Sequence, residues 1–278
     1  MGIPNLITIP KEYEVIKLEQ RKASIQPIKS KLKISILDDQ EISQINQNTR
    51  AVYIISLQYD RIMKKKVIDI CDVLNLHFSL LPKCRGVSPI AHAMINCEEK
   101  TGVSLHYIDE GTDTGDLIAQ AETKIEDTDT GRSIYEKLTK IGIALFKDNY
   151  KGMLDFNLMR RKQNNKNASY YAREDINFNE NTIRWNKTTR QVSYWIRAFI
   201  FPPFQYPKII LDKEYNVTQI EAEYFNNKYE PCGTICDVNE EGIKVATTDG
   251  YVVIKRLEAN GVKVPIESLS KNIGRVLK

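Results

Sequence analysis

Residues 51–57 (AVYIISL) form an uninterrupted apolar run that is rich in β-branched side chains. Such a run predicts a strand covered on both faces, because a strand with one solvated face would alternate polar and apolar residues. The basic stretch 62–70 that follows suits a helix, and residues 72–76 read as a second short strand. Strands that alternate with helical segments indicate an α/β domain with crossover connections and a parallel sheet.

The chain continues this alternation as far as residue 145. Ser88 and Pro89 predict the start of a helix reaching about Asn96, because serine suits the N-cap and proline the first helical position. Strands are expected next at 103–108 and 117–125. An amphipathic helix follows, with apolar residues spaced by four, three and four on one face: Ile134, Leu138, Ile141 and Leu145.

A polar stretch at 160–167 (RRKQNNKN) suits a linker, and after it the predicted elements change from alternating strands and helices to mainly short strands. One helix, at 188–199, precedes short apolar segments separated by turn residues, which predict strands at 208–211, 217–224, 233–238, 242–247 and 251–257. We therefore predict an α/β domain over 1–158, a linker over 159–187, and a small β-rich, barrel-like domain over 188–278.

Composition narrows the class of protein without naming a function. The five cysteines are odd in number and contain no close CxxC pair, so we expect reduced thiols in the cytoplasm and no metal site. No apolar run approaches the roughly 20 residues that cross a bilayer, and the first residues lack the features of a secretory signal. A net charge of +4 permits an anionic partner but does not select one.

Polar side chains that could carry chemistry gather between residues 75 and 116. Asn75 and His77 are two residues apart, so in a strand they face the same side, at its carboxyl end. Asp109, Asp113 and Asp116 lie in a glycine-containing loop after the next strand. An amide, an imidazole and a carboxylate that converge there suit acyl transfer, with a base, an oxyanion donor and an orienting carboxylate.

These residues also allow a plainer interpretation. A histidine and an asparagine at a strand end are commonly a hydrogen-bonded structural pair, and a loop of this kind is commonly an ordinary turn. His92 is expected to be a packing or surface residue of its helix. His106 alternates with apolar neighbours on a strand, where packing is the first expectation and a place in an acceptor cleft the second.

The same block resembles the signature of the 10-formyltetrahydrofolate-dependent formyltransferases, which act on methionyl-tRNA, glycinamide ribonucleotide or sugar nucleotides. The matching motifs are Asn75-Leu76-His77, Ser79-Leu80-Leu81-Pro82, Arg85-Gly86 with Pro89, Thr101-Gly102-Val103, and Asp109-Glu110-Gly111-Thr112-Asp113-Thr114-Gly115. The likeness extends to 56–59 and to the carboxy-terminal segments 196–199 and 233–250. It implies a Rossmann-like formyltransferase domain followed by the appended β-rich domain.

The resemblance also implies roles for individual residues. Asn75 would donate to the oxyanion, and Asp113 would hold and tune His77. His77 would either remove the proton of the acceptor amine or, as imidazolium, stabilise the oxyanion. No metal is implied, and the residues that would bind the 10-formyltetrahydrofolate co-substrate are Ser56, Leu57, Gln58, Tyr59, Ile108 and Asp109.

The amino-terminal part of the chain is shorter than the resemblance leads us to expect. Residues 6–9 suit the second strand of the family's sheet, so the first strand and first helix are expected to be absent. A parallel sheet without a central strand would expose apolar and backbone groups. We therefore expect an amino-terminal truncation, which would leave the protein unstable, weakly active or inactive.

Three interpretations of the acceptor remain open. We favour an amino-deoxy sugar nucleotide, because 171–175 and 183–185 are similar to the stretch that joins the two domains of sugar N-formyltransferases; the resemblance also allows a homodimer. The candidate acceptor-binding residues are Arg85, Arg173 and Trp185, the last two to contact phosphate and base unless they are a linker arginine and a core tryptophan. The alternatives are a methionyl-tRNA formyltransferase, which would need a basic stripe for tRNA, and a non-catalytic folate- or nucleotide-binding remnant.

Overall fold

The computed structural model describes residues 5–10, 35–37, 51–57, 62–224 and 230–277. The chain forms two compact units that interleave in sequence. The first unit comprises Met1–Gly86, Gly102–Glu122 and Leu138–Tyr170, and the second comprises Val87–Thr101, Thr123–Lys137 and Tyr171–Lys278. Within the described part of the chain, none of the helices has the length and apolar character that crossing a bilayer requires.

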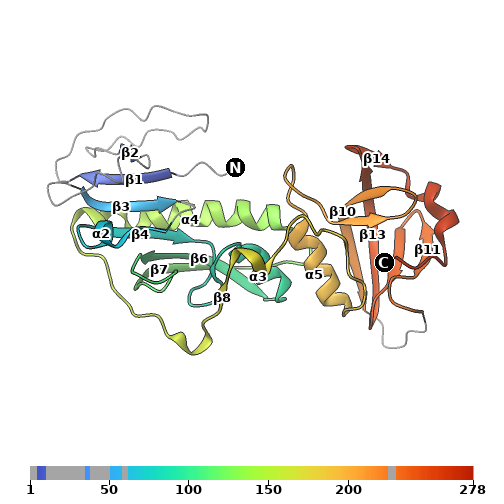
Figure 1. Cartoon of the computed structure of the whole chain (residues 1–278), viewed down its shortest axis with the longest axis horizontal. Coiled ribbons are helices and arrows are strands. Elements are labelled where there is room, and N and C mark those ends of the chain that lie inside the picture. The colour runs from blue at the N-terminus through green and yellow to red at the C-terminus, as the bar shows by residue number, and fades with distance from the viewer. Residues whose placement is uncertain (1–4, 11–34, 38–50, 58–61, 225–229, 278) are drawn as a thin grey trace. The chain divides into compact units, whose positions relative to one another are not determined.

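A six-stranded sheet forms the centre of the first unit, in the order β2-β1-β3-β4-β6-β7 (Figure 1). Its strands are β1 Asn5–Pro10, β2 Ser35–Leu37, β3 Ala51–Leu57, β4 Asp72–His77, β6 Lys100–Tyr107 and β7 Leu117–Lys124. The uninterrupted apolar run thus forms an interior strand, and the α/β, Rossmann-like class of the amino-terminal domain is confirmed.

The directions of the strands differ from the parallel sheet that the alternation predicted. β3 and β4 are parallel, but β4 and β6 are antiparallel, and β1 is antiparallel to both β2 and β3. The helix between β4 and β6, α3 Pro89–Ile95, packs against another helix, α5 Thr189–Phe199, and does not act as a crossover helix. The chain therefore re-enters the sheet at the end where β4 leaves it.

Two other helices belong to the amino-terminal part of the chain. α2 Lys65–Ile68 is shorter than the stretch predicted for it, and buries Val67 in a cluster with Ile54 and Val73. α4 Gly131–Leu154 is longer than predicted, because it continues nine residues past Leu145. Gly142 of α4 lies against Phe78 and Val103 of the sheet region, which shows that this helix covers the sheet.

The helix predicted at Pro89 begins there, but Ser88 does not cap it. Ser88 has φ 53° and ψ 45°, and its side chain makes no capping hydrogen bond. A capping serine needs an extended backbone so that its oxygen can reach the first free N–H groups. The left-handed conformation at Ser88 therefore makes the predicted cap wrong while the predicted boundary holds.

The carboxy-terminal region of the second unit contains a second, antiparallel sheet in the order β11-β12-β13-β10-β9, with β14 paired to β13. Its strands are β9 Lys208–Ile210, β10 Glu214–Tyr224, β11 Ile235–Asn239, β12 Gly242–Ala246, β13 Gly250–Ala259 and β14 Val262–Val264. The β-rich domain is confirmed, although its strand order is open between β11 and β9, and the sequence did not predict β14.

Helix α5 packs against β10 and β13 of this sheet and completes its core. The helix begins in a capping box, in which Thr188 accepts from the backbone of Gln191. Asp249, in the turn before β13, also accepts hydrogen bonds from the backbone and the hydroxyl of Thr189. Asp249 thus holds the start of a helix that lies 60 residues earlier in the chain.

Short elements complete the described structure. A two-stranded sheet pairs β5 Arg85–Gly86 with β8 Tyr170–Tyr171. Single 3₁₀ turns occur at η1 Asn165–Asn167 and η2 Arg173–Asp175, and a longer 3₁₀ helix at η3 Ile266–Asn272. The two-stranded sheet pairs the stretch that was predicted to be a linker with the loop that follows β4.

Candidate active site

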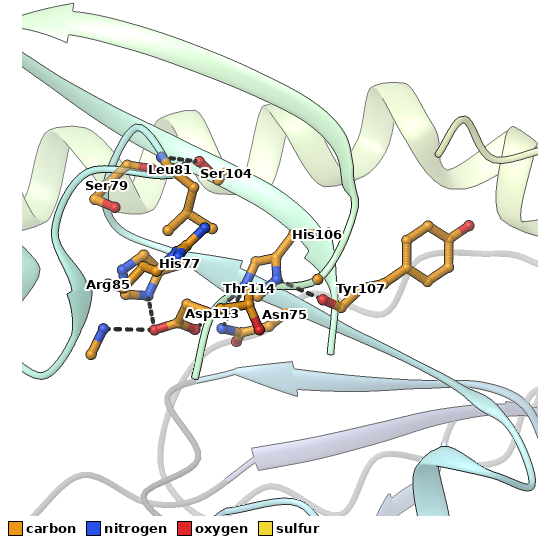
Figure 2. A network of polar contacts seen from close by, with 12 residues as sticks. Asn75, His77, Ser79, Leu81, Arg85, Ser104, His106, Tyr107, Asp113 and Thr114 are labelled. Carbon is orange, nitrogen blue, oxygen red and sulfur yellow. Dashed lines mark hydrogen bonds and ion pairs between the residues drawn. The ribbon is translucent and has the colours of Figure 1, made fainter. Parts of the chain in front are cut away.

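Three polar side chains share one face of β4 and β6. Asn75 and His77 are two residues apart on β4, and His106 of β6 stands directly opposite Asn75 in the antiparallel register. His77 is 7% exposed, His106 is fully buried, and Asn75 is half-buried. Figure 2 shows the three side chains gathered around the carboxylate of Asp113.

The loop that carries Asp113 reaches this face by an unexpected route. Because β6 is antiparallel to β4, its carboxyl end does not lie beside the carboxyl end of β4. The Ile108 N–H donates to the Val73 carbonyl at 2.7 Å, and the Tyr107 N–H donates to the Asp116 carbonyl at 2.9 Å. Residues 108–115 therefore form a closed excursion beside β4, and this excursion brings Asp113 over the site.

Asp113 is held in an unusual backbone conformation. Its φ is 53°, in the left-handed region, which costs an aspartate about 1 kcal/mol relative to an ordinary conformation. Its Oδ2 accepts a hydrogen bond of 2.8 Å from the Gly86 N–H and lies 3.5 Å from His77 Nδ1. Its Oδ1 lies 3.5 Å from His106 Nε2, so the carboxylate stands between two imidazoles (Figure 2).

The outer nitrogen of each imidazole donates to a backbone carbonyl. His77 Nε2 lies 2.8 Å from the Cys84 carbonyl oxygen, and His106 Nδ1 lies 2.7 Å from the carbonyl oxygen of Tyr107. A carbonyl can only accept, so these contacts fix the proton on Nε2 of His77 and on Nδ1 of His106. The nitrogens that face Asp113 are then His77 Nδ1 and His106 Nε2, and the latter also lies 3.2 Å from Asn75 Nδ2.

Burial and the neighbouring charges set the protonation of this group. Burial lowers the pKa of His77 below its usual value, against the opposing effects of Asp113 and the Cys84 carbonyl. Burial alone would raise the pKa of Asp113. The contact with His106 Nε2, the attraction of His77 when it is protonated and the Gly86 N–H outweigh burial and lower the pKa of Asp113 to about 2. At neutral pH the site therefore holds an ionised Asp113 beside a neutral His77.

Arg85 is buried beside these residues, and two of its guanidinium nitrogens donate to side-chain amide oxygens. Its Nε and Nη2 donate to Gln163 Oε1 at 3.2 and 2.6 Å, and Nη2 also donates to Asn165 Oδ1 at 2.7 Å. The side chain is 8% exposed. Arg85 thus lies at the edge of the site, as a candidate acceptor-binding residue should, but its visible contacts are with the protein.

The predicted folate-binding residues fall into three groups. Ser56 is 5% exposed and lies next to Asn75 in the parallel register of β3 and β4, while Leu57 ends β3. Gln58 and Tyr59 lie outside the described residues. The remaining two lie in the loop after β6. Ile108 packs on the cluster around Val67, and exposed Asp109 accepts hydrogen bonds from Thr114 and Gly111 that stabilise the loop.

The two acceptor-binding candidates of the connecting stretch lie in the second unit. Arg173 is exposed, in the 3₁₀ turn η2. Trp185 is 4% exposed and belongs to the core of the carboxy-terminal domain, with Ile183 and Val192. A tryptophan enclosed by core side chains has no free face for a nucleobase, so the expectation of base stacking at Trp185 is corrected to a packing role.

Of the residues of the site, the sequence left Gln163 unidentified and gave His106 a functional role only as a second expectation. His106 was expected first to be a packing residue, because its place opposite Asn75 depends on the antiparallel register. Gln163 lies in the stretch predicted to be a linker, and its Nε2 donates to the carbonyls of Asp113 and Gly115 at 2.8 Å each. No local sequence signal marks Gln163. Among the described residues, no group of three or more metal-ligating side chains is close enough to hold a metal ion.

Comparison with protein families gives matches along most of the chain. Residues 6–148 match the formyl transferase family, and residues 175–272 match the formyl transferase C-terminal domain. Methionyl-tRNA formyltransferase from Fusobacterium nucleatum is 32% identical over 94% of this chain and 90% of that protein. The methionyl-tRNA formyltransferase from Clostridium tetani is also 32% identical, over 92% of this chain and 88% of that protein.

Solved structures with the same fold include sugar N-formyltransferases. An N-formyltransferase from Helicobacter canadensis, in complex with folinic acid and dTDP-3-aminofucose, is 31% identical with a TM-score of 0.68, over 80% of this chain and 78% of that one. The sugar 3N-formyltransferase WlaRD, with dTDP and 5-N-formyl-THF, is 33% identical with a TM-score of 0.63, over 72% and 70%. From the family matches and these relatives, this chain belongs to the formyl transferase family.

Proposed function

We propose that this protein transfers the formyl group of 10-formyltetrahydrofolate to the primary amine of an amino-deoxy sugar nucleotide. Formyl transfer from a folate follows from the family, and the acceptor is the part proposed here. The observation that carries it is the likeness to two sugar N-formyltransferase structures at 31% and 33% identity. A methionyl-tRNA formyltransferase structure from Clostridium thermocellum is 20% identical, which supports the shared fold alone.

The charges of the carboxy-terminal sheet support a small acceptor. Basic side chains there form ion pairs with acidic neighbours: Lys208 with Glu214, Lys244 with Glu223, Lys255 with Glu221 and Glu241, and Arg256 with Glu258. A surface that follows the phosphates of tRNA needs basic groups whose charge is not already neutralised. A sugar nucleotide places its negative charge at one point and makes no such demand.

Methionyl-tRNA is the second candidate acceptor, because a specific observation favours it. The curated relatives that match 92–94% of this chain at 32% identity are methionyl-tRNA formyltransferases. The two candidates share the donor and the proposed catalytic residues. They differ in the charge and size of the acceptor, so a direct comparison of acceptors separates them.

The geometry suggests how the catalytic residues divide the work. When bound, the folate donor would supply an activated formyl carbon to the acceptor amine; the bond from this carbon to the folate nitrogen breaks, and tetrahydrofolate leaves with the proton that the amine gives up. One N–H of the Asn75 amide points to His106 Nε2, which leaves the second N–H to donate to the formyl oxygen as negative charge develops there. Ser56 offers a polar group beside Asn75 on the donor side of the site.

The amine must lose a proton as the new bond forms, and His77 suits that step. Its Nε2 proton is held by the Cys84 carbonyl, and its Nδ1 carries a lone pair because burial keeps the ring neutral. Nδ1 can accept the amine proton, and the ionised Asp113 at 3.5 Å then stabilises the imidazolium. The low pKa of Asp113, about 2, keeps its charge available throughout.

The acceptor is tested by incubating the purified protein with 10-formyltetrahydrofolate and a panel of acceptors, while tetrahydrofolate release is followed. The panel holds dTDP- and UDP-linked 3-amino and 4-amino sugars and methionyl initiator tRNA. We expect turnover with a sugar nucleotide, and His77→Ala should reduce it by about 10² or more. His92→Ala serves as the matched control, because His92 is a buried histidine that stacks on Tyr171 in the second unit.

Each outcome assigns the acceptor or rejects the proposal. Turnover with methionyl-tRNA and none with the sugar nucleotides would transfer the assignment to tRNA. Turnover that His77→Ala leaves intact would reject the catalytic role of His77 while keeping the acceptor. No turnover with any acceptor, from folded protein, would favour a non-catalytic binding role.

A further inference from the structure

The side chain of Gln163 uses its complete hydrogen-bonding capacity at the candidate active site. Its Nε2 donates to the carbonyl oxygens of Asp113 and Gly115, each at 2.8 Å. Its Oε1 accepts from Nε and Nη2 of Arg85 at 3.2 and 2.6 Å. The two ends of the amide face partners of opposite kind, so its orientation is fixed.

Gln163 stands apart from its neighbours in the chain. Every other residue from 160 to 168 is exposed, whereas Gln163 is half-buried. The family matches end at residue 148 and resume at residue 175, so Gln163 falls between the two matched domains. A polar residue that turns inward from an exposed stretch and saturates its hydrogen bonds indicates a specific task for that side chain.

The contacts of Gln163 complete a cycle of hydrogen-bonded residues that includes Asp113. Gln163 binds the backbone of Asp113 on one side and the side chain of Arg85 on the other. Gly86, the residue after Arg85, donates its N–H to Asp113 Oδ2 at 2.8 Å. Gln163 therefore holds the backbone of Asp113, and Gly86 holds its carboxylate. Gln163 is also bonded to Arg85, the residue next to Gly86, so the two holding segments are linked to each other.

These hydrogen bonds fix the direction of the Asp113 carboxylate. Asp113 has the left-handed φ of 53°, and its carboxylate lies 3.5 Å from both His77 Nδ1 and His106 Nε2. A residue in this conformation returns to ordinary backbone angles unless the surrounding contacts hold it there. Fixing the carbonyl oxygens of Asp113 and Gly115 fixes the turn of the loop, and with it the direction of the carboxylate.

We propose that Gln163 is a positioning residue for formyl transfer, which acts through the backbone of Asp113. The inference rests on the proposed function, since it needs Asp113 to act on His77 during the reaction. Gln163 holds the loop so that the carboxylate meets His77 at the moment the imidazolium forms. A displacement of about 1 Å in such a group reduces a rate by as much as 10² without changing the binding of substrate.

Two substitutions separate this role from simple stabilisation. Gln163→Met keeps the length of the side chain and removes all its hydrogen bonds. Gln163→Glu keeps the acceptor for Arg85 and removes the donors to the carbonyls of Asp113 and Gly115. Lys166→Ala, an exposed position three residues further on, is the control. Folding is checked by circular dichroism, and folate binding by calorimetry with 5-formyltetrahydrofolate.

We expect both Gln163 variants to lower kcat by about tenfold or more, while the Kd for 5-formyltetrahydrofolate changes less than about twofold. The pH dependence of kcat should shift as well, because His77 loses part of the influence of Asp113. In an Asp113→Asn background, Gln163→Glu should cause no further loss, since both changes act through one group. Lys166→Ala should keep the kcat and pH profile of the unaltered protein.

The results distinguish failure of this inference from failure of the proposed function. If Gln163→Glu folds and keeps kcat within about twofold while Asp113→Asn loses most of its kcat, Gln163 has no positioning role. Additive losses in the double variant would overturn the inference in the same way. If Asp113→Asn itself keeps full activity, the proposed role of Asp113 fails, and the inference about Gln163 fails with it for that reason. Should Gln163→Met fail to fold, Gln163→Glu still decides the question.

Discussion

At the scale of single residues, the site is a carboxylate shared by two imidazoles. Asp113 lies 3.5 Å from a nitrogen of His77 and 3.5 Å from a nitrogen of His106. Each ring is turned toward the carboxylate because its other nitrogen donates to a backbone carbonyl. Such outer contacts commonly decide which nitrogen of a histidine is available for chemistry. His106 therefore merits a test of its own beside the three residues assigned catalytic roles.

Replacing His106 with phenylalanine is expected to lower kcat by about tenfold to a hundredfold. The ring volume stays similar, but Asn75 loses the acceptor for one amide N–H and Asp113 loses one of its two imidazoles. Steady-state kinetics on purified variants measure the effect. His92→Phe is the matched control, since His92 is also buried but stacks on Tyr171 in the second unit. Equal activity of the two variants would rule out a contribution of His106.

The protonation of His77 gives a second prediction at this scale. Burial lowers the pKa of His77 below its usual value, whereas Asp113 acts to raise it. Replacing Asp113 with asparagine removes the raising influence, so His77 should titrate at a still lower pH. If His77 is the base, the acid limb of any residual kcat should move in the same direction, because the neutral ring persists to lower pH.

Proton NMR can follow this titration, because the chain has only three histidines and substitution assigns each signal. His92, whose pKa burial also lowers, faces Asp175 and serves as the internal reference. A His77 signal that titrates at or above 6.5 in the unaltered protein would contradict the assignment of a neutral base. A shift of His92 equal to that of His77 in Asp113→Asn would point to a general change of structure.

At the scale of elements, the excursion between β6 and β7 gives the site its carboxylate. The excursion starts and ends at one point, because the Tyr107 N–H donates to the Asp116 carbonyl at 2.9 Å. Gly115 lies against the backbone there, and a Cβ atom added to it would stand 1.9 Å from the Tyr107 carbonyl oxygen. This oxygen belongs to the backbone and cannot rotate away as a side chain could, so the close approach requires glycine.

Gly115→Ala should therefore lower the free energy of unfolding by about 1–3 kcal/mol and reduce kcat, since the loop that carries Asp113 must shift. Thermal unfolding and steady-state kinetics measure the two effects. Gly111→Ala is the comparison, because the added Cβ would meet the Thr114 hydroxyl, which belongs to a side chain that can rotate. A stable and fully active Gly115→Ala variant would show that the backbone of the excursion adjusts freely.

At the scale of the whole molecule, charge separates the two candidate acceptors. The net charge is +4, with 40 basic and 36 acidic residues, so any preference for a polyanion must come from the arrangement of charges. In the described strands of the carboxy-terminal sheet, four of the five basic side chains form ion pairs with acidic ones, the fifth being Lys263. Pairing of this kind leaves the surface with little positive electrostatic potential to attract a long nucleic acid.

The salt dependence of KM should therefore be weak. Between 50 and 200 mM salt, the KM for a sugar nucleotide is expected to rise by less than about tenfold. A protein that contacts 6–10 phosphates loses about 10³–10⁵ in affinity over the same range. The measurement uses the preferred acceptor at constant pH and a saturating concentration of the folate donor. A loss of several orders of magnitude would favour tRNA in spite of the paired charges.

The sequence alone determined the local elements and the identity of the three central residues. The apolar run at 51–57, the proline at the start of α3 and the alternating segments of the carboxy-terminal domain each carry their structure in a few neighbouring residues. The motif around Asn75, His77 and Asp113 is equally local, so it could be compared with a family directly. Local spacing predicts which faces side chains share, because strands and helices have fixed periods.

Only the tertiary structure decided how these elements combine into a site. The antiparallel direction of β6 places His106 opposite Asn75, and no spacing within either strand contains that information. The inward turn of Gln163 and the burial of Trp185 likewise depend on partners far away in the chain. Hydrogen bonds and packing between distant segments are set by the direction in which each segment re-enters the fold, and a linear pattern does not record that direction.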